Sequence, residues 1–482
     1  AVGSSCVLAR DSELAESPPF ETRMVRGGSA IPPPTSMTAS SRGKRVRSCL
    51  VALLALPVLL AVACLLLVLH VRLHYPQHPS PLAEQSQLGC LRVRLPPPVR
   101  EDGRRGGTAG RPGPMLQLLY PADASAAALG RERYVRPPVI QALAETLGFP
   151  FWFSHFVLSR AGVDATRVPA RALGREAGRW PVVVFSSGLL GCLEMYTQFG
   201  RELAAAGAIV VLVEHEDGSG SYAEDACTGE VLRPQPPPRN YSGSRRELIR
   251  WRRPFLRKRV EELRQVVDFV RQTAGGVVKS AHQGAVEDEG HGLLFDLMSL
   301  ADPSAVILAG HSFGTASVLL ALQQGLAGVV RGALLYDPWL APVPDRAINA
   351  GVPVPYAIFL SGEWAGYSHE VARIRALGRR RKAVAVACVA GTRHQWISDA
   401  TFWLPQFMLR HLHVLGPADR QLAHAATAQA TRLALEELLS ERPCRAVFRP
   451  TFRAWARSPV ESSLSSDLAV LHPQLSLDLM PL

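Results

Sequence analysis

The stretch "SAVILAGHSFGTASVLLALQQG" at residues 304–325 joins two apolar runs through the pentapeptide GHSFG. The run before the serine is typical of a buried strand, and the run after it has the residue types of a helix. A serine hydroxyl is a weak nucleophile, so it needs a neighbouring base and a position from which its oxygen projects. A sharp turn from strand to helix provides that position, and Gly310 and Gly314 leave room for the adjacent strand and helix. The pattern predicts Ser312 as a nucleophile at such a turn.

Apolar runs of strand length recur along the chain and alternate with helical patterns. Continuous apolar runs of this kind are buried on both faces of a parallel sheet. They lie at 116–120, 181–186, 208–214, 305–310, 332–337, 356–362 and 383–390. Helical spacing is clearest after Pro254, where apolar residues recur every three or four positions. The alternation predicts an α/β-hydrolase fold with a mostly parallel, doubly wound sheet.

The partners of the serine follow it in this architecture in the order acid, then histidine. His394 is favoured as the base because "AVAVACVAGTRHQ" places it in a loop just after a strand, at the sheet edge where Ser312 emerges. Asp337 ends the strand "GALLYD" at the same edge and is favoured as the acid, with Asp345 and Asp399 as alternatives. We therefore expect a Ser-Asp-His triad that needs no metal and no cofactor.

Hydrolysis of an acyl ester also requires backbone N–H groups that bind the developing oxyanion. One belongs to the residue after the nucleophile, here Phe313, and the other to a loop after an early strand. That loop falls in "VVVFSSGLLGCLEMY", where Gly188 and Leu189 follow a predicted strand. We expect the second donor to be the N–H of Leu189.

Five stretches together resemble the platelet-activating factor acetylhydrolase family, the calcium-independent lipases of plasma and cytosolic type. They are "PVVVFSSGLLG", "IVVLVEHEDGS", "GHSFGTA", "LLYDPWLAPV" and "RHQWISDATFW", within residues 115–414. The resemblance implies a serine esterase that removes short or oxidised acyl chains from the sn-2 position of glycerophospholipids through an acyl-enzyme. It carries over the triad Ser312, Asp337 and His394, the oxyanion donors Leu189 and Phe313, and the elbow residues Gly310, His311 and Gly314.

The sequence departs from the family at two positions beside these motifs. The family usually has histidine where Ser187 stands and glycine where Thr315 stands. Both departures bear on the shape of the pocket and on substrate preference. Because a catalytic triad does not by itself select the leaving group of the substrate, a general carboxylesterase or lipase is an alternative function. A non-catalytic binding protein of the same fold is a second alternative, against which the complete triad argues.

The charge of the chain bears on its partners. Its 53 Lys+Arg against 41 Asp+Glu give a net charge of +12, which suits an anionic membrane surface or nucleic acid. No zinc-finger spacing or RNA-binding signature accompanies the charge, and the eight cysteines form no CxxC pair. We therefore predict a phospholipid substrate at a membrane or lipoprotein surface and no nucleic-acid partner.

Residues 49–69 are uncharged and predominantly apolar, which predicts a transmembrane helix. The basic flank before this run predicts a cytosolic N-terminus, a type II signal anchor and a lumenal or extracellular catalytic domain. The alternative is a secreted protein from which the segment is removed. In that compartment Asn240, in the sequon Asn-Tyr-Ser, would be a glycosylation site.

The remaining organisation follows from composition. We expect a disordered basic segment at 1–48, a linker rich in proline, glycine and arginine at 70–113, a catalytic domain at 114–445 and a tail at 446–482.

Overall fold

The computed structural model describes most of the chain from residue 57 onwards. The described residues are 61–71, 87–97, 111–122, 130–159, 162–167, 179–276, 289–378, 383–440 and 477–479, with Pro57, Leu59, Leu73 and Tyr75. The chain divides into two compact units, Ala1–His70 and Val71–Leu482. The predicted basic segment at 1–48 lies outside the described residues.

The predicted membrane span at 49–69 requires a correction. Residues 49–56 lie outside the described residues, and residues 61–71 are helical. No helix in the described parts of the chain is both long and apolar enough to cross a membrane. The predictions of a signal anchor, of type II topology and of a membrane-tethered lumenal domain are therefore wrong, while the secreted alternative stays a prediction.

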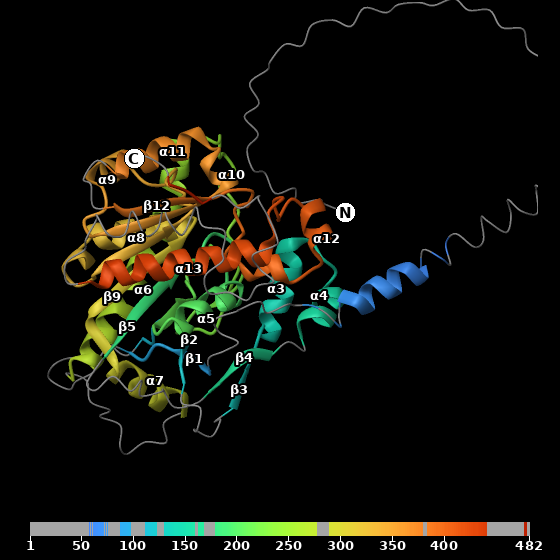
Figure 1. The fold of residues 1–482 in the computed structure, drawn as a ribbon, viewed down its shortest axis with the longest axis horizontal. Coiled ribbons are helices and arrows are strands. Elements are labelled where there is room, and N and C mark those ends of the chain that lie inside the picture. The colour runs from blue at the N-terminus through green and yellow to red at the C-terminus, as the bar shows by residue number, and fades with distance from the viewer. Residues whose placement is uncertain are drawn as a thin grey trace, which may run out of the picture. The chain divides into compact units, whose positions relative to one another are not determined.

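An 11-stranded sheet in the order β13-β12-β11-β10-β9-β5-β6-β2-β1-β4-β3 forms the centre of the second unit (Figure 1). Its strands are β1 (Leu88–Arg94), β2 (Met115–Pro121), β3 (Gly130–Arg133), β4 (Gly162–Arg167), β5 (Trp180–Ser186), β6 (Ile209–Val213), β9 (Ala301–His311), β10 (Gly332–Tyr336), β11 (Tyr356–Ser361), β12 (Ala383–Val389) and β13 (Leu477–Leu479). The short β7 (Ala223–Glu224) and β8 (Val231–Leu232) form a separate hairpin.

The six neighbouring strands from β6 to β12 in this order run parallel. Antiparallel strands extend the sheet at both ends, with β2 beside β6 and β13 beside β12. β6 and β10 are buried along their whole length, as expected of strands covered on both faces. Each predicted apolar run coincides with a strand, and the arrangement fits the predicted α/β-hydrolase fold.

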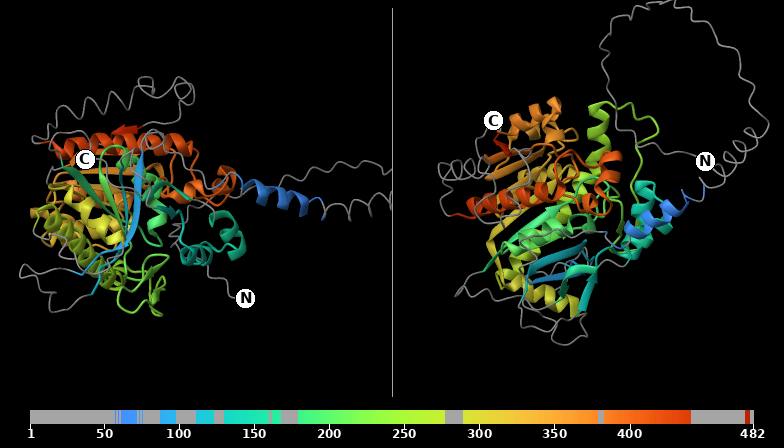
Figure 2. Two further views of the ribbon diagram at one scale, coloured as in Figure 1. Left: turned by 90° about the horizontal axis from the view of Figure 1, so that it is seen from below. Right: turned by 45° about the vertical axis from the view of Figure 1, so that its right-hand side comes forward.

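Helices cover both faces of the sheet (Figure 2). α5 (Thr197–Ala205) and α13 (Arg420–Leu439) pack on one face, and α6 (Arg245–Ala274) and α8 (Phe313–Gln323) pack on the other. Further helices in the described part of the second unit are α3 (Pro137–Leu147), α4 (Phe151–Leu158), α7 (Glu289–Ser299), α9 (Asp345–Ala350), α10 (Gly362–Ala365), α11 (Ser368–Leu377) and α12 (Gln406–His411), with 3-10 turns at Leu193–Tyr196, Leu326–Gly328 and Asp399–Phe402.

The structure differs from the sequence-based expectation in two elements that support the site. The expected linker at 70–113 contains β1, whose apolar side chains are buried against β2. Helix α6 begins at Arg245, before the Pro254 at which the sequence pattern becomes clear. Its first turn is capped by the Ser244 side chain, which accepts a hydrogen bond from the Glu247 N–H. Both elements have a local sequence pattern that the surrounding arginines and prolines obscure.

Candidate active site

Ser312 lies at the turn between β9, which ends at His311, and α8, which begins at Phe313. Its backbone has φ 55° and ψ −118°, a conformation unfavourable for a residue with a side chain. A Cβ atom on Gly314 would lie 2.0 Å from the Ser186 carbonyl oxygen, and one on Gly310 would lie 2.6 Å from the Gly314 backbone. The two glycines are therefore required for the turn that carries Ser312.

Strained backbone conformations are concentrated at the predicted site. Among the described residues, the non-glycine residues with positive φ are Leu190, Ser312, Asp337 and His413. Three of these four belong to the predicted oxyanion loop, nucleophile and acid. Conformations of this kind persist only where surrounding contacts hold them, and they cluster at active sites.

Asp337 and His394 are in direct contact. Asp337 follows β10, His394 follows β12, and His394 Nδ1 lies 2.9 Å from Asp337 Oδ2. Ser361, at the end of β11, donates its N–H to Asp337 Oδ1 and its hydroxyl to Oδ2, both at 2.7 Å. Three donors thus converge on one buried carboxylate, and this fixes its orientation toward the imidazole.

The electrostatics of Asp337 reflect both its burial and these donors. Burial raises the pKa of Asp337, and the hydrogen bonds from His394 and Ser361 oppose that rise. A buried carboxylate beside Nδ1 favours the imidazole tautomer that carries its proton on Nδ1. The Nε2 lone pair of His394 is then available to accept a proton.

The ring of His394 is held by its neighbours. The Trp364 indole stacks on it with ring centroids 4.2 Å apart, and the His311 ring lies 4.6 Å away. The backbone N–H of His394 donates to Glu363 Oε2 at 2.9 Å. These contacts restrict rotation of the imidazole away from Asp337.

His311 links the nucleophile turn to the histidine loop. Its Nε2 lies 3.0 Å from the His394 carbonyl oxygen, and its Nδ1 lies 2.9 Å from the Tyr196 hydroxyl. Burial, together with the nearby His394, lowers the pKa of His311 well below its ordinary value, so the ring is neutral. A neutral ring that donates from Nε2 accepts from the Tyr196 hydroxyl at Nδ1, and this satisfies both nitrogens.

The Ser312 hydroxyl forms no hydrogen bond with another residue in the described part of the chain. Ser312 nevertheless lies at the same sheet edge as the pair, because its neighbour His311 contacts His394 through both ring and hydrogen bond. Catalytic hydrogen bonds are often long without substrate and shorten in the enzyme–substrate complex. The geometry therefore suits a nucleophile and base that close on a bound ester.

The two predicted oxyanion donors flank Ser312. A Cβ atom on Gly188 would lie 3.1 Å from Ser312 Cβ, so the backbone before Leu189 lies against the nucleophile. Phe313 is the first residue of α8, and its N–H, like that of Leu189, has no acceptor among the described residues. Both N–H groups are therefore free to bind an oxyanion.

The two alternative acids, Asp345 and Asp399, interact with other residues. Asp345 lies at the exposed start of α9 and forms an ion pair with Arg245 at 2.8 Å. Asp399 is buried and accepts hydrogen bonds from the Tyr134 hydroxyl at 2.7 Å and from the Gln198 N–H at 3.1 Å. Among the described residues, neither carboxylate is hydrogen-bonded to His394, which leaves Asp337 as the acid that the geometry favours.

Asp399 provides a test of stability against pH. Burial raises the pKa of Asp399 from its ordinary 3.8 to about 7. The folded chain therefore binds more protons than the unfolded chain between these values, and the free energy of unfolding falls as pH rises from about 4 to about 7. Asp399→Asn should flatten this dependence, as measured by urea unfolding at pH 5 and pH 7.5. An equally steep fall in the variant would contradict the assignment.

Sequence motifs did not predict several contacts of this site. Ser361 ends β11, within the predicted strand at 356–362, so its place at the correct end of a strand was the signal for it. Tyr196 and Trp364 carry no such signal, because their contacts depend on side-chain packing between distant segments. Asn240 lies in an exposed turn, and its glycosylation stays a prediction.

The donor set does not favour a metal. His311, Asp337 and His394 place ligand atoms within 4.8 Å of one another. However, both nitrogens of His311 and Nδ1 of His394 already take part in hydrogen bonds. A metal ion would have to displace these bonds, so the residues fit a proton relay better than a metal centre.

Comparisons with known proteins agree on a family. The sequence pattern of platelet-activating factor acetylhydrolase, isoform II, matches residues 105–442. The platelet-activating factor acetylhydrolase of Cavia porcellus is 26% identical over 67% of this chain and 72% of its own length. That of Canis lupus familiaris is 25% identical over 62% of this chain and 66% of its own. A ferulic acid esterase from Streptomyces cinnamoneus, 19% identical, superposes with a TM-score of 0.53 over 82% of this chain and 96% of its own, a likeness that concerns the fold alone.

Proposed function

This chain belongs to the platelet-activating factor acetylhydrolase, isoform II, family and is a serine esterase or lipase-type hydrolase, and we propose that it hydrolyses glycerophospholipids at the sn-2 ester. The proposed substrates carry a short or oxidised acyl chain, as in 1-alkyl-2-acetylglycerophosphocholine. The observation that carries the proposal is the contact of His394 with Asp337 at the sheet edge where strained Ser312 emerges.

In the proposed reaction Ser312 Oγ attacks the sn-2 carbonyl carbon while His394 Nε2 takes its proton. The carbonyl oxygen becomes an oxyanion and binds the N–H groups of Leu189 and Phe313. As the carbon–oxygen bond to glycerol breaks, His394 returns the proton to the lysophospholipid. A water molecule, deprotonated by His394, then attacks the acyl-enzyme and releases the fatty acid and Ser312.

The two departures from the family lie beside the nucleophile. The Thr315 hydroxyl lies 3.2 Å from the Gly310 carbonyl oxygen and 3.4 Å from that of Tyr336. It is buried under the turn, so it adds rigidity there without entering the pocket. Ser187 is also buried, and a shorter side chain than histidine at that position leaves more volume next to Gly188 and Leu189.

A substrate comparison tests the proposal. We expect rapid release of acetate from 1-alkyl-2-acetylglycerophosphocholine and slow hydrolysis of a matched phospholipid with a long sn-2 chain, together with fluorophosphonate labelling of Ser312. Ser312→Ala, which is expected to retain the fold, is the control for both measurements. Hydrolysis of simple aryl esters but of neither phospholipid would favour the general carboxylesterase, and an unlabelled protein without turnover would favour a binding protein.

Metal removal separates the triad from a metal site at the same residues. A serine nucleophile with a histidine base needs no metal, so turnover of the acetyl substrate should be unchanged after dialysis against EDTA. Turnover that is lost on chelation and restored by a single divalent cation would instead assign His311, Asp337 and His394 to that cation.

A further inference from the structure

We propose that Arg259 is a positioning residue that directs the Leu189 N–H group toward the reacting ester oxygen. The inference rests on the proposed hydrolysis at Ser312 and assigns a role to a residue outside the triad and the oxyanion donors. Arg259 lies on α6 and acts through residues 187–191, which we call the oxyanion loop.

Arg259 is a buried guanidinium held by the oxyanion loop and by the segment beside it. Its side chain is 0% exposed. Nη1 donates to the Ser187 carbonyl oxygen at 2.5 Å, and Nη2 lies 3.5 Å from the Gly188 carbonyl oxygen. Nε donates to Asp217 Oδ2 at 2.8 Å, and Nη2 donates to Ser219 Oγ at 2.7 Å. Because a buried charge without partners is strongly unfavourable, these acceptors determine where the guanidinium lies.

The contacts with two successive carbonyl groups orient two peptide planes. In a trans peptide the C=O and N–H groups point in opposite directions. The Gly188 carbonyl oxygen faces Arg259, so the Leu189 N–H in the same plane points away from Arg259. Without the guanidinium this peptide would keep only the 3.3 Å contact of its oxygen with the Gly191 N–H. Rotation of the plane would then turn the Leu189 N–H away from the ester.

The preceding peptide shows which side of the loop lies opposite Arg259. The Ser187 carbonyl oxygen meets Arg259, and the Gly188 N–H of the same plane donates to the Tyr196 hydroxyl at 3.2 Å. That hydroxyl contacts His311, the residue before the nucleophile. The side of the loop away from Arg259 is therefore the side on which the ester reacts.

The loop needs such support because it is strained. Leu190 has φ 57°, a conformation that disfavours a branched side chain. Its N–H donates to the Ser219 carbonyl oxygen at 2.8 Å, and Ser219 is itself bound by Asp217 through its N–H at 3.0 Å. Arg259 joins Asp217 and Ser219 to the oxyanion loop, so one side chain connects the loop to the segment that holds Leu190.

The charge of Arg259 lies beside the peptide that carries the Leu189 N–H. A cation next to a peptide carbonyl polarises the peptide and strengthens its N–H as a donor. The Arg259 guanidinium carbon also lies 4.8 Å from the centroid of the Phe313 ring. Burial raises the pKa of Asp217, but the nearby Arg259 guanidinium outweighs this effect and lowers the pKa, so Asp217 is ionised. The two residues therefore act as a unit behind the oxyanion site.

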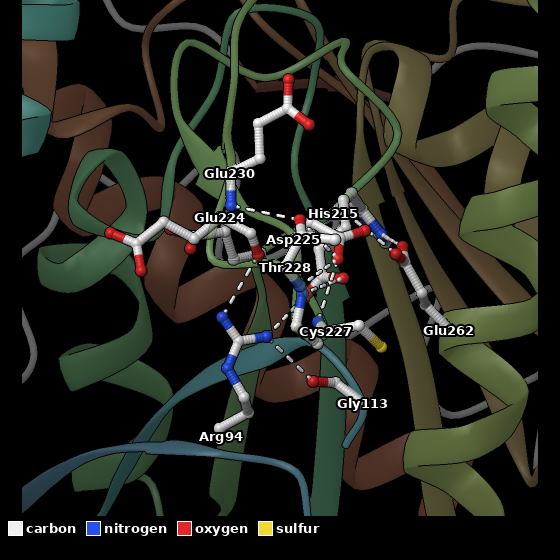
Figure 3. Close-up of polar contacts among 12 residues, drawn as sticks. Arg94, Gly113, His215, Glu224, Asp225, Cys227, Thr228, Glu230 and Glu262 are labelled. Atoms are coloured by element: carbon white, nitrogen blue, oxygen red, sulfur yellow. Dashed lines mark hydrogen bonds and ion pairs between the residues drawn. The ribbon is translucent and has the colours of Figure 1, made fainter. Parts of the chain in front are cut away.

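The strand that leads into the oxyanion loop is fixed by a second residue of α6. The Ser186 hydroxyl lies 2.7 Å from His215 Nε2. His215 Nδ1 lies 2.7 Å from Glu262 Oε2 (Figure 3). Glu262 follows Arg259 by three positions, so both side chains leave the same face of the helix. With the end of β5 fixed in this way, loss of Arg259 is expected to disturb the loop and not the strand.

The test uses the full chain and an aryl acetate, which a serine esterase of this fold hydrolyses whatever its natural lipid. Arg259→Met should lower kcat by about 10²-fold with KM little changed, comparable to removal of one oxyanion donor. Inhibition by a trifluoromethyl ketone, whose adduct with Ser312 carries an oxyanion, should weaken in parallel. Binding of an unreactive ether analogue should be unchanged. If the protein hydrolyses aryl acetates but not the proposed phospholipids, these expectations for Arg259→Met are unchanged.

Two further variants keep the test informative. Asp217→Asn keeps the shape of the side chain that pairs with Arg259, and it should lower kcat by about tenfold. In the double variant of Arg259→Met and Asp217→Asn, the effects of the two substitutions on kcat should not be additive. Arg201→Met removes another buried arginine, on α5, and should lower thermal stability without changing kcat. Equal weakening of the ketone and the ether analogue, or full kcat in folded Arg259→Met, would overturn the proposal.

Discussion

Asp337→Asn is expected to lower kcat for ester hydrolysis by about 10⁴-fold, with KM little changed. The amide nitrogen of asparagine would face His394 Nδ1 and favour the tautomer with its proton on Nε2. That tautomer cannot accept the proton of Ser312. The contacts of the side chain with Ser361 should preserve the position of the residue, so the loss reports on proton transfer. Steady-state kinetics with the acetyl phospholipid measure it.

The matched controls are Asp345→Asn and Asp399→Asn, which change the alternative acids. Asp345 is paired with Arg245 at the surface and Asp399 is bound by Tyr134, so both variants should retain nearly full kcat. A normal rate for Asp337→Asn and a large loss for either control would move the role of the acid to that residue.

Gly314→Ala is expected to destabilise the fold by about 3 kcal/mol or more and to abolish hydrolysis. The added methyl group would lie 2.0 Å from the Ser186 carbonyl oxygen, and backbone cannot move aside as a flexible side chain can. The start of α8 would have to shift away from β5, and Ser312 would move with it. Thermal unfolding should show a fall in Tm of about 4 °C or more.

The control for this substitution is Gly292→Ala in α7. A Cβ atom there meets no other atom within 4 Å, and alanine is favoured over glycine inside a helix. Its Tm should be equal to that of the wild type or slightly higher. A wild-type Tm for Gly314→Ala would show that the turn relaxes more easily than the packing indicates.

The sequence predicted the sheet and the positions of Ser312, Asp337 and His394 for one physical reason. Parallel strands are buried on both faces and therefore appear as continuous apolar runs, and residues that follow such runs meet at one edge of the sheet. The choice among Asp337, Asp345 and Asp399 depends instead on which side chain the fold turns toward the histidine. Sequence order alone leaves that choice open.

The parts that the sequence did not predict depend on packing between distant segments or on weak local signals. Arg259 reads as one more arginine on a basic helix, yet it is buried because Asp217 and two loop carbonyls surround it. Ser244 is a recognisable N-cap residue for α6, but Pro254 inside the helix suggested a later start. The apolar run at 49–69 suggested a membrane span, but no helix among the described residues is both long and apolar enough to cross a membrane.

The central pairing of β5 with β9 has a consequence for how the enzyme becomes active during folding. These neighbours are joined through residues 187–300, which include the whole of α6. Closing a loop of that length before any contact forms is entropically unfavourable, and contacts between distant residues slow folding. Helix α6 can form early from local contacts, but the oxyanion loop and the nucleophile turn meet only when β9 docks beside β5. Recovery of esterase activity in refolding should therefore follow the slowest phase seen by tryptophan fluorescence and lag behind the recovery of helix content.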